Sequence, residues 1–289
     1  MKNNIGAVVV HHKHYDTVGA VVSSLLGEGI LAANVVVIDN SEEPEQLESL
    51  RASLVAGVTL IAVENKGYGA AVNLGVQTLA EARRFDYILV ATHEVVIEKG
   101  AVAKLASALD NDPTVGAAGP VLTVEADGKA LIWSSGGRFA AVSGIPQHHD
   151  HKTSYAEFAR RTFPATLDRS WLDGAFVLYR ADPLVHHRIN ELFFMYIEEV
   201  ELHERLRRDG LRVVVVPEAR VEQSSNGTPI YYFSRNLIVL HRLLGHRWRI
   251  ALVPALVCRS TLAQVVRKRS LQPIASALSG TLDGLRARI

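Results

Sequence analysis

Residues Glu191–Pro217, ELFFMYIEEVELHERLRRDGLRVVVVP, contain an aromatic run, a carboxylate cluster, a helical pattern and an apolar run in direct succession. Leu202 and Leu206 recur at the spacing of a helix face that packs on a core. Gly210 predicts the end of that helix, and residues 211–216 predict a buried strand that ends at the proline. The carboxylates are Glu198, Glu199 and Glu201. The positive end of a helix dipole favours negative charge, so helix capping alone is one interpretation of this cluster.

Upstream of this stretch, apolar strands alternate with helical segments. Strands are predicted over 5–10, 34–38, 58–63 and 87–91, and helices over 17–26, 43–54 and 100–109, with a further helix that ends near Arg83. Such alternation predicts a parallel sheet with right-handed crossovers. Because the strands are continuously apolar, we expect both faces of the sheet to be covered.

Polar side chains follow each of these four strands. They are His11 and His12 after the first strand, Asp39 after the second, Asn65 and Lys66 after the third, and Thr92, His93 and Glu94 after the fourth. The carboxyl ends of parallel strands share one edge of a sheet, and ligands of open α/β folds bind at that edge. The sequence therefore predicts that four separate segments line one pocket.

The pattern weakens between residues 121 and 170. Residues 133–137, WSSGG, predict a turn, and residues 147–151, QHHDH, predict a polar loop on the acceptor side. Histidines at positions i, i+1 and i+3 of such a run have no fixed geometry, so they do not predict a metal site.

Composition bounds the class of protein. The chain has 289 residues and 48% hydrophobic content, enough for one large α/β domain or two small ones. Its single cysteine excludes an internal disulfide, and the first residues lead into a strand without a signal-peptide pattern. We therefore expect a cytoplasmic protein. No run reaches about 18 uninterrupted apolar residues, the length of a membrane-spanning helix.

The net charge of +1 hides a split along the chain. Residues 235–289 contain ten lysines and arginines and one acidic residue, a net charge of +9, so residues 1–234 carry −8. The basic segment is rich in leucine and valine but poor in aromatic residues, which argues against nucleic acid as its partner. We expect an amphipathic helical tail that lies on an anionic membrane surface, peripheral on its inner face. The alternative is a pair of helices that forms a homodimer and leaves its arginines solvated.

The stretch over 191–217 and the upstream segment Ser170–Arg180, SWLDGAFVLYR, together resemble the second half of the family two inverting glycosyltransferases, especially bacterial rhamnosyltransferase-like members. In that family an apolar strand with a Gly-Ala pair precedes FF-x-Y-x-E-D-x-D-L-x-x-R-x-x-x-x-G and a strand that ends in proline. Here the acidic part reads E-E-x-E. The resemblance implies that Glu199 is the catalytic base.

The fold implied by the resemblance is the GT-A type, a Rossmann-like nucleotide-diphospho-sugar transferase fold. Its nucleotide-binding half would cover about residues 1–120, its acceptor half about 121–234, and the helical tail 235–289. The implied reaction moves a sugar from a nucleoside diphosphate sugar, of the UDP or dTDP type, to an acceptor hydroxyl with inversion. The basic tail favours a lipid-linked acceptor.

The resemblance also implies a donor site. Asp39 in VVVIDNS matches the aspartate that binds the nucleotide base, although an aspartate here also suits an Asx turn. Residues 65–75, NKGYGAAVNLG, resemble the family segment N-x-G-x-x-x-x-x-N-x-G, whose glycines let backbone approach phosphate. The predicted donor-binding residues are His11, Asp39, Asn65, Lys66, Gly69, Asn73, His93 and Glu94.

The metal positions depart from the family pattern. Thr92 and Glu94 align with the two aspartates of the family's D-x-D motif, which binds Mg²⁺ or Mn²⁺, and Gln223 aligns with a metal-binding histidine. Metal dependence is therefore open: Glu94 holds an ion loosely, or cations such as Lys66, His93 and Arg235 neutralise the leaving diphosphate. Loss of catalysis is a third outcome.

The predicted acceptor-binding residues are Trp171, Asp173, Gly174 and Glu198, with core packing as the other interpretation of Trp171. One rival enzyme class, the sugar nucleotidyltransferases, normally has a glycine- and arginine-rich phosphate loop after the first strand. The sequence HHKHY at 11–15 does not supply one. Another rival is a non-catalytic sugar-nucleotide-binding or scaffold protein of the same fold.

Overall fold

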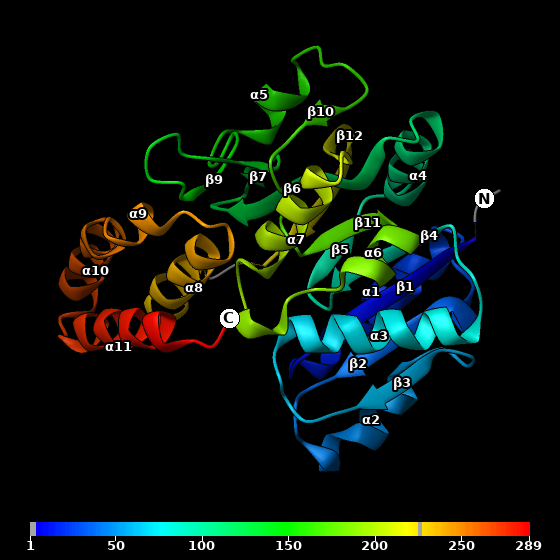
Figure 1. Cartoon of the computed structure of the whole chain (residues 1–289). Helices are drawn as coiled ribbons and strands as arrows, with labels where there is room; N and C mark the ends of the chain where they lie inside the picture. The colour runs from blue at the N-terminus through cyan, green and yellow to red at the C-terminus, as the bar shows by residue number, and fades with distance from the viewer. Residues whose placement is uncertain (1–3, 225–226) are drawn as a thin grey trace.

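The computed structural model describes residues 4–224 and 227–289 and shows a ten-stranded mixed sheet flanked by helices (Figure 1). The strands are β1 Ile5–His11, β2 Val35–Asp39, β3 Thr59–Ala62, β4 Tyr87–Thr92, β5 Val95–Ile97, β6 Val115–Ala126, β7 Lys129–Ser134, β8 Gly137–Phe139, β9 Pro146–His148, β10 Leu167–Asp168, β11 Phe176–Arg180 and β12 Arg212–Gln223. The helices are α1 Tyr15–Gly27, α2 Leu47–Ser53, α3 Tyr68–Ala82, α4 Ala101–Asn111, α5 Tyr155–Ala159, α6 Ala181–His187, α7 Glu198–Arg208, α8 Ile230–Leu243, α9 Arg247–Ile250, α10 Val253–Lys268 and α11 Gln272–Arg286. Short 3₁₀ turns cover Ala32–Asn34, Pro44–Gln46 and Glu191–Phe193.

The N-terminal half is the predicted parallel sheet. The main sheet has the order β10-β12-β6-β11-β4-β1-β2-β3, and the neighbours β4, β1, β2 and β3 pair in parallel. All seven residues of β1 are buried, and its side chains alternate between two cores. Val9 packs in the core that includes α1 and α4, whereas Val8 packs in the core that includes α3 and α7. Helices therefore cover both faces of the sheet, as the apolar strands predict.

The second half of the sheet is mixed. Strand β11 runs antiparallel to both β4 and β6, while β12 runs parallel to β6. The expected strand end at Pro217 is wrong, because β12 continues to Gln223. A register shift between Val215 and Arg220 contains the proline, which cannot donate a ladder hydrogen bond and is tolerated at such an irregularity.

The weakly patterned segment is more regular than expected. Strands β6 and β7 form a hairpin, and β8 pairs with β9. The expected turn over 133–137 is therefore wrong at its ends, which belong to β7 and β8, and the expected loop over 147–151 begins inside β9. Strands β8 and β9 have three residues each, too few for an alternating pattern, and their pairing is set by tertiary contacts rather than local sequence.

Four helices, α8 to α11, form the C-terminal part, at the opposite side of the molecule from β3 in Figure 1. Helix α8 begins before the expected tail boundary at residue 235, so that boundary falls inside a helix. A third apolar cluster joins α8 and α10 to the segment that leads into α7, through Leu240, Val257 and Phe193. The C-terminal helices thus pack directly against the start of α7.

Candidate active site

A cavity of about 510 Å³ lies at the carboxyl ends of β1, β2 and β4 and at the start of α7. On one side it is lined by His12, His14, Asn40, Asn65, Tyr68, Thr92, His93 and Glu94, and on the other by Trp133, His148, Trp171, Asp173, Gly174, Glu198 and Glu199. Residues that follow each of the four parallel strands line it together, as the sequence predicts. We call the two walls the donor side and the acceptor side.

Glu199 lies in the first turn of α7, partly exposed to the cavity. A Cβ added at Gly174 would lie 3.6 Å from the Cβ and Cγ of Glu199, so the backbone of Gly174 passes beside the stem of this side chain. Burial raises the pKa of Glu199 well above its ordinary value, and the neighbouring carboxylates of Glu198 and Asp173 raise it further. A carboxylate with a raised pKa is a stronger base than an exposed one, which suits a group that accepts a proton.

Glu198 stands beside it and is only 4% exposed. Burial and, to a smaller extent, the charge of Asp173 raise its pKa to about 7. Its Oε2 atom has no hydrogen-bond partner within the described part of the chain. A buried oxygen that lacks a partner costs free energy, so a ligand hydroxyl that donated to it would be favoured.

An irregular backbone delivers α7 into the cavity. Phe194, Tyr196 and Ile197 all have positive φ angles, of 63°, 70° and 73°, which are strained for side chains of this size. The fully buried Asn236 holds this turn: its amide donates to the carbonyls of Phe193, Met195 and Tyr196 at 3.1, 2.7 and 2.9 Å. Arg235 donates to the carbonyls of Leu192 and Phe193 and does not line the cavity, so it does not face a bound diphosphate there.

The acceptor side is built on Asp173 and two tryptophans. Asp173 accepts hydrogen bonds from Trp133 Nε1 at 2.9 Å and from the Ala175 amide at 3.2 Å. Trp171 is 3% exposed, donates to the Arg138 carbonyl at 3.3 Å and still contributes to the cavity wall. Trp171 is therefore packed in the core and also forms part of the cavity wall, and its role in acceptor binding stays a prediction.

His148 completes this wall and was missed by sequence reasoning, as was Trp133. The ring of His148 lies 5.4 Å from the Trp133 ring and 4.9 Å from the Trp171 ring. The buried Nδ1 atom of His148 has no hydrogen-bond partner among the described residues. The signal was present in the two aromatic and histidine-rich segments. The pairing of β8 with β9 brings these segments together, and the isolated bridge between Gly137 and Trp171 adds the third aromatic residue.

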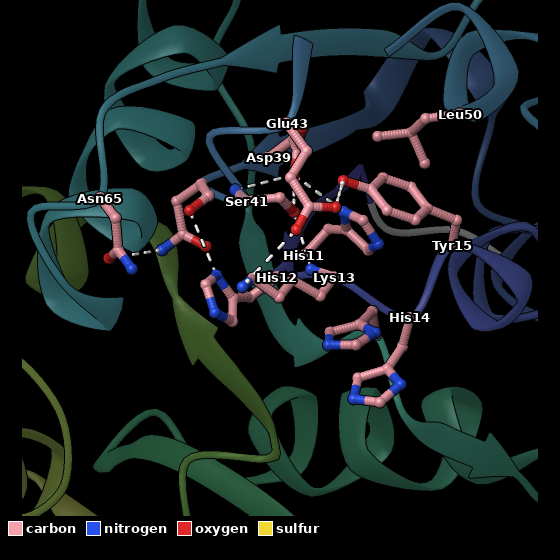
Figure 2. Close-up of polar contacts among 12 residues, drawn as sticks. His11, His12, Lys13, His14, Tyr15, Asp39, Ser41, Glu43, Leu50 and Asn65 are labelled. Atoms are coloured by element: carbon pink, nitrogen blue, oxygen red, sulfur yellow. Dashed lines mark hydrogen bonds and ion pairs between the residues drawn. The ribbon is translucent and has the colours of Figure 1, made fainter. Parts of the chain in front are cut away.

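On the donor side, His11 and Asp39 bond to each other and do not line the cavity (Figure 2). His11 Nδ1 lies 2.9 Å from Asp39 Oδ1, and the Ser41 amide and hydroxyl also donate to that oxygen. Burial would raise the pKa of Asp39, but hydrogen bonds from His11 and Ser41 outweigh burial and lower it. Asp39 is 3% exposed, and the neighbouring Asn40 lines the cavity in its place.

The predicted phosphate segment divides between the cavity and the core. Asn65 lines the cavity, whereas Lys66 is exposed and pairs with Glu64 at 3.2 Å. Gly69 does not line the cavity, since it packs against Ile189, where an added Cβ would come within 2.7 Å of Ile189 Cγ2. Asn73 is also remote from the cavity: its amide bonds both the N–H and the carbonyl of Ile189 at 2.8 Å. These two residues tie α3 to the segment that precedes α7.

The aligned metal positions, Thr92, Glu94 and Gln223, do meet at the cavity. They provide one hydroxyl, one carboxylate and one amide, and Glu94 Oε2 already accepts from Ser224 Oγ at 2.5 Å. No group of three or more His, Cys, Asp or Glu side chains suited to a metal ion occurs in the described ranges. These residues therefore do not fit a metal ion held by protein ligands alone.

His93 is neutral in this site. Burial, together with the nearby His11 and His14, lowers its pKa to about 3. Thr17 Oγ1 donates to the His14 carbonyl, so at 2.8 Å it accepts from His93 Nδ1. The expectation that His93 supplies a positive charge to a diphosphate is thus not supported by the geometry. Within the described residues that line the cavity there is no lysine or arginine, which leaves His12 and His14 as the ionisable nitrogen bases of the donor side.

Comparison with known proteins gives the same fold and family. The sequence profile of the family described as Glycosyltransferase like family 2 matches residues 3–239. The N-acetylglucosaminyl-diphospho-decaprenol L-rhamnosyltransferase of Mycobacterium tuberculosis, in strains CDC 1551 and H37Rv, is 29% identical over 172 residues. That alignment covers 54% of this chain and 55% of the relative, so the chain matches about half of the relative's length.

Two solved structures share the fold. GalNAc-T7, solved with UDP, GalNAc and Mn²⁺, superposes with a TM-score of 0.65 at 16% identity, over 83% of this chain and 48% of its own. The mannosyltransferase PcManGT from Pyrobaculum calidifontis, solved with GDP-Man and Mn²⁺, gives a TM-score of 0.57 at 13% identity, over 99% of this chain and 81% of its own. The match of the family profile to most of the sequence, on a GT-A fold with this cavity, shows that the chain belongs to glycosyltransferase family 2.

Proposed function

We propose that the protein is an inverting glycosyltransferase that moves a sugar from a nucleoside diphosphate sugar, of the UDP or dTDP type, to an acceptor hydroxyl. The observation that carries the proposal is the place of Glu199, on the cavity wall shared with Asp173 and Glu198 and opposite the strand ends of the donor side. The family match and the raised pKa of Glu199 support it.

In the proposed reaction the acceptor oxygen attacks the anomeric carbon while its proton passes to a carboxylate oxygen of Glu199. The new C–O bond forms as the bond from the anomeric carbon to the diphosphate oxygen breaks on the opposite face, so the configuration inverts. The nucleoside diphosphate departs with the bonding electrons. Donors such as the Asn65 amide and the ring N–H groups of His12 and His14 would stabilise that charge.

The donor can be identified by thermal shift. We expect UDP or dTDP and their sugars to raise the Tm, whereas GDP does not, because a ligand that binds only the folded state stabilises it by mass action. Each nucleotide is measured with Mg²⁺, with Mn²⁺ and with EDTA. We expect the shift to persist in EDTA, since Glu94 alone is a weak metal site. A shift lost in EDTA would contradict the metal-free donor site, and no shift with any nucleotide would contradict the donor class.

The acceptor wall favours a sugar as acceptor. Trp133, His148 and Trp171 present aromatic surface beside Asp173, and apolar sugar faces pack on such rings while hydroxyls bond to carboxylates. The rhamnosyltransferase relative is named for a lipid-linked N-acetylglucosaminyl diphosphate. We therefore propose that the acceptor is a lipid-linked sugar of this kind.

Replacing Trp133 with alanine is expected to raise the acceptor KM about tenfold, because about 1–1.5 kcal/mol of ring contact is lost. Donor affinity should not change, since Trp133 contacts the acceptor side. Steady-state kinetics with an N-acetylglucosaminyl diphosphate lipid and the donor found by thermal shift would measure both. Trp133→Phe is the matched control: it keeps a ring and loses the N–H bond to Asp173. A Trp133→Ala enzyme with an unchanged acceptor KM would contradict this acceptor wall.

A non-catalytic sugar-nucleotide-binding protein is the second candidate, favoured by the single carboxylate among the three aligned metal positions. Both candidates predict that the protein binds a nucleotide sugar, but only the enzyme turns over its donor. A measurement of donor turnover by the wild type, and of its loss in a Glu199 variant, therefore separates the two candidates.

A further inference from the structure

The last two helices carry an unpartnered apolar surface. Along α11 the exposed residues recur at helical spacing, and Leu262 and Val266 continue the surface on α10 (Figure 1 shows both helices at the edge of the molecule). These residues are Leu271, directly before α11, and Ile274, Leu278, Leu282 and Leu285 within it, which are 72%, 38%, 61%, 49% and 49% exposed. A contiguous exposed apolar face of this kind marks a site of interaction rather than ordinary surface. We call it the α10–α11 face.

The orientation of this face is fixed by packing on the other side of α11. Gly280 and Gly284 lie against the α8 backbone, where an added Cβ would come within 2.3 Å of the Tyr231 carbonyl and 2.7 Å of the Arg235 carbonyl. Tyr231 also donates to Asp283 at 2.9 Å, and Arg242 donates to the Gly284 carbonyl at 2.8 Å. Helix α11 therefore cannot roll to hide its leucines without breaking these contacts.

Charge decides between the partners of such a face. Residues 235–289 carry +9, and the exposed arginines in or directly beside α10 and α11 are Arg269, Arg286 and Arg288. Two copies of so basic a surface would repel each other, whereas a bilayer with anionic headgroups would attract it. We propose that the α10–α11 face docks on the surface of an anionic lipid bilayer, with its leucines among the acyl chains and its arginines at the headgroups.

In this proposal helix α10 lies along the membrane surface rather than across the bilayer. By length and composition, Arg247–Val266 could span a bilayer, with a mean hydropathy of 1.4 and 18% of it buried. However, Val253, Val257 and Thr261 recur every four residues and are 0%, 2% and 5% exposed, and the two valines belong to the apolar cluster that includes α8. A spanning helix would expose this inner face to lipid and lose the cluster. A helix with one packed and one exposed face suits the interface.

Vesicle co-sedimentation of the full chain, without substrates, tests this docking independently of the proposed reaction. We expect binding to phosphatidylcholine vesicles that contain phosphatidylglycerol, weak binding to phosphatidylcholine alone, and release at high salt as the headgroup charge is screened. The double substitution Leu278→Glu and Leu282→Glu should lower the partition coefficient at least about tenfold, because it places two charges where apolar side chains enter the bilayer.

Leu31→Glu is the matched control, since Leu31 is 63% exposed and lies in the parallel half of the fold, before β2. It should bind vesicles as the wild type does, and the Tm of each variant confirms folding. The proposal would be overturned by wild-type vesicle binding of the double variant, or by binding that high salt and alkaline carbonate do not release. It would equally be overturned by a wild-type dimer in sedimentation that the double variant abolishes without any vesicle binding.

Discussion

Replacing Glu199 with glutamine is expected to lower kcat by about 10²–10⁴-fold, the usual contribution of a positioned general base. Glutamine keeps the shape of the side chain but cannot take the proton from the acceptor hydroxyl. Donor binding should survive, so the Tm increase produced by the nucleotide should remain close to that of the wild type. Steady-state turnover together with the thermal shift measures both effects. Full turnover by Glu199→Gln would remove the proposed mechanism.

The pH profile provides the control for this prediction. A base acts only when ionised, so kcat/KM should fall as the pH decreases through the pKa of Glu199. Burial and the charges of Glu198 and Asp173 raise that pKa, so the acid limb should lie above the range of an ordinary glutamate, whose pKa is 4.5. Glu198→Gln removes the nearer charge and should move the limb to lower pH. A limb that stayed in place would show that another group titrates.

The parallel half of the fold could be predicted because its information is local. Continuous apolar strands such as β1 and β2, separated by amphipathic helices, read directly as a covered parallel sheet. The strands of the acceptor half were harder to predict from sequence, because most of them pair with strands far along the chain. Pro217 illustrates this: a proline normally ends a strand, but β12 accommodates it at a register irregularity and reaches Gln223.

The sequence also predicted the part of the site that lies at the ends of the parallel strands. Residues placed by strand ends, such as Asn65 and Glu94, reach the cavity because the sheet edge puts them there. Asn73 shares a motif with Asn65 but lies in the second turn of α3, on the side that meets Ile189, so its amide bonds backbone instead. Trp133 lies on β7, which the two-residue turn Asp127-Gly128 joins to β6, so a local signal for this strand was present. The contacts of Trp133 with Asp173 and with His148 on β9 are long-range, and sequence spacing therefore could not assign these side chains to the cavity.

Asn236 should be as important to the site as any residue that lines it. Replacing it with aspartate removes both N–H donors and places a carboxylate against the carbonyls of Phe193, Met195 and Tyr196. We expect the free energy of unfolding to fall by about 1–3 kcal/mol, because buried carbonyls lose their donors. Arg235 donates to Asn236 Oδ1 at 2.6 Å and would pair with the new carboxylate, which limits the loss. Protonation of the aspartate at acid pH gives it an O–H donor for one of the carbonyls and should recover part of the loss. Chemical denaturation at neutral and acidic pH measures both values.

Asn190→Asp is the matched control for this change, because it is the same substitution at a residue whose side chain bonds the same loop with the opposite hydrogen-bond role. Asn190 Oδ1 accepts from the Leu192 amide at 3.1 Å, and a carboxylate oxygen can accept that bond equally well. The control should therefore unfold as the wild type does. Because Asn236 fixes the strained turn before α7, Asn236→Asp should also lower kcat where it remains folded, through displacement of Glu199. A variant that unfolds as the wild type does, with unchanged kcat, would mean that packing around Phe193 alone sets the position of the proposed base.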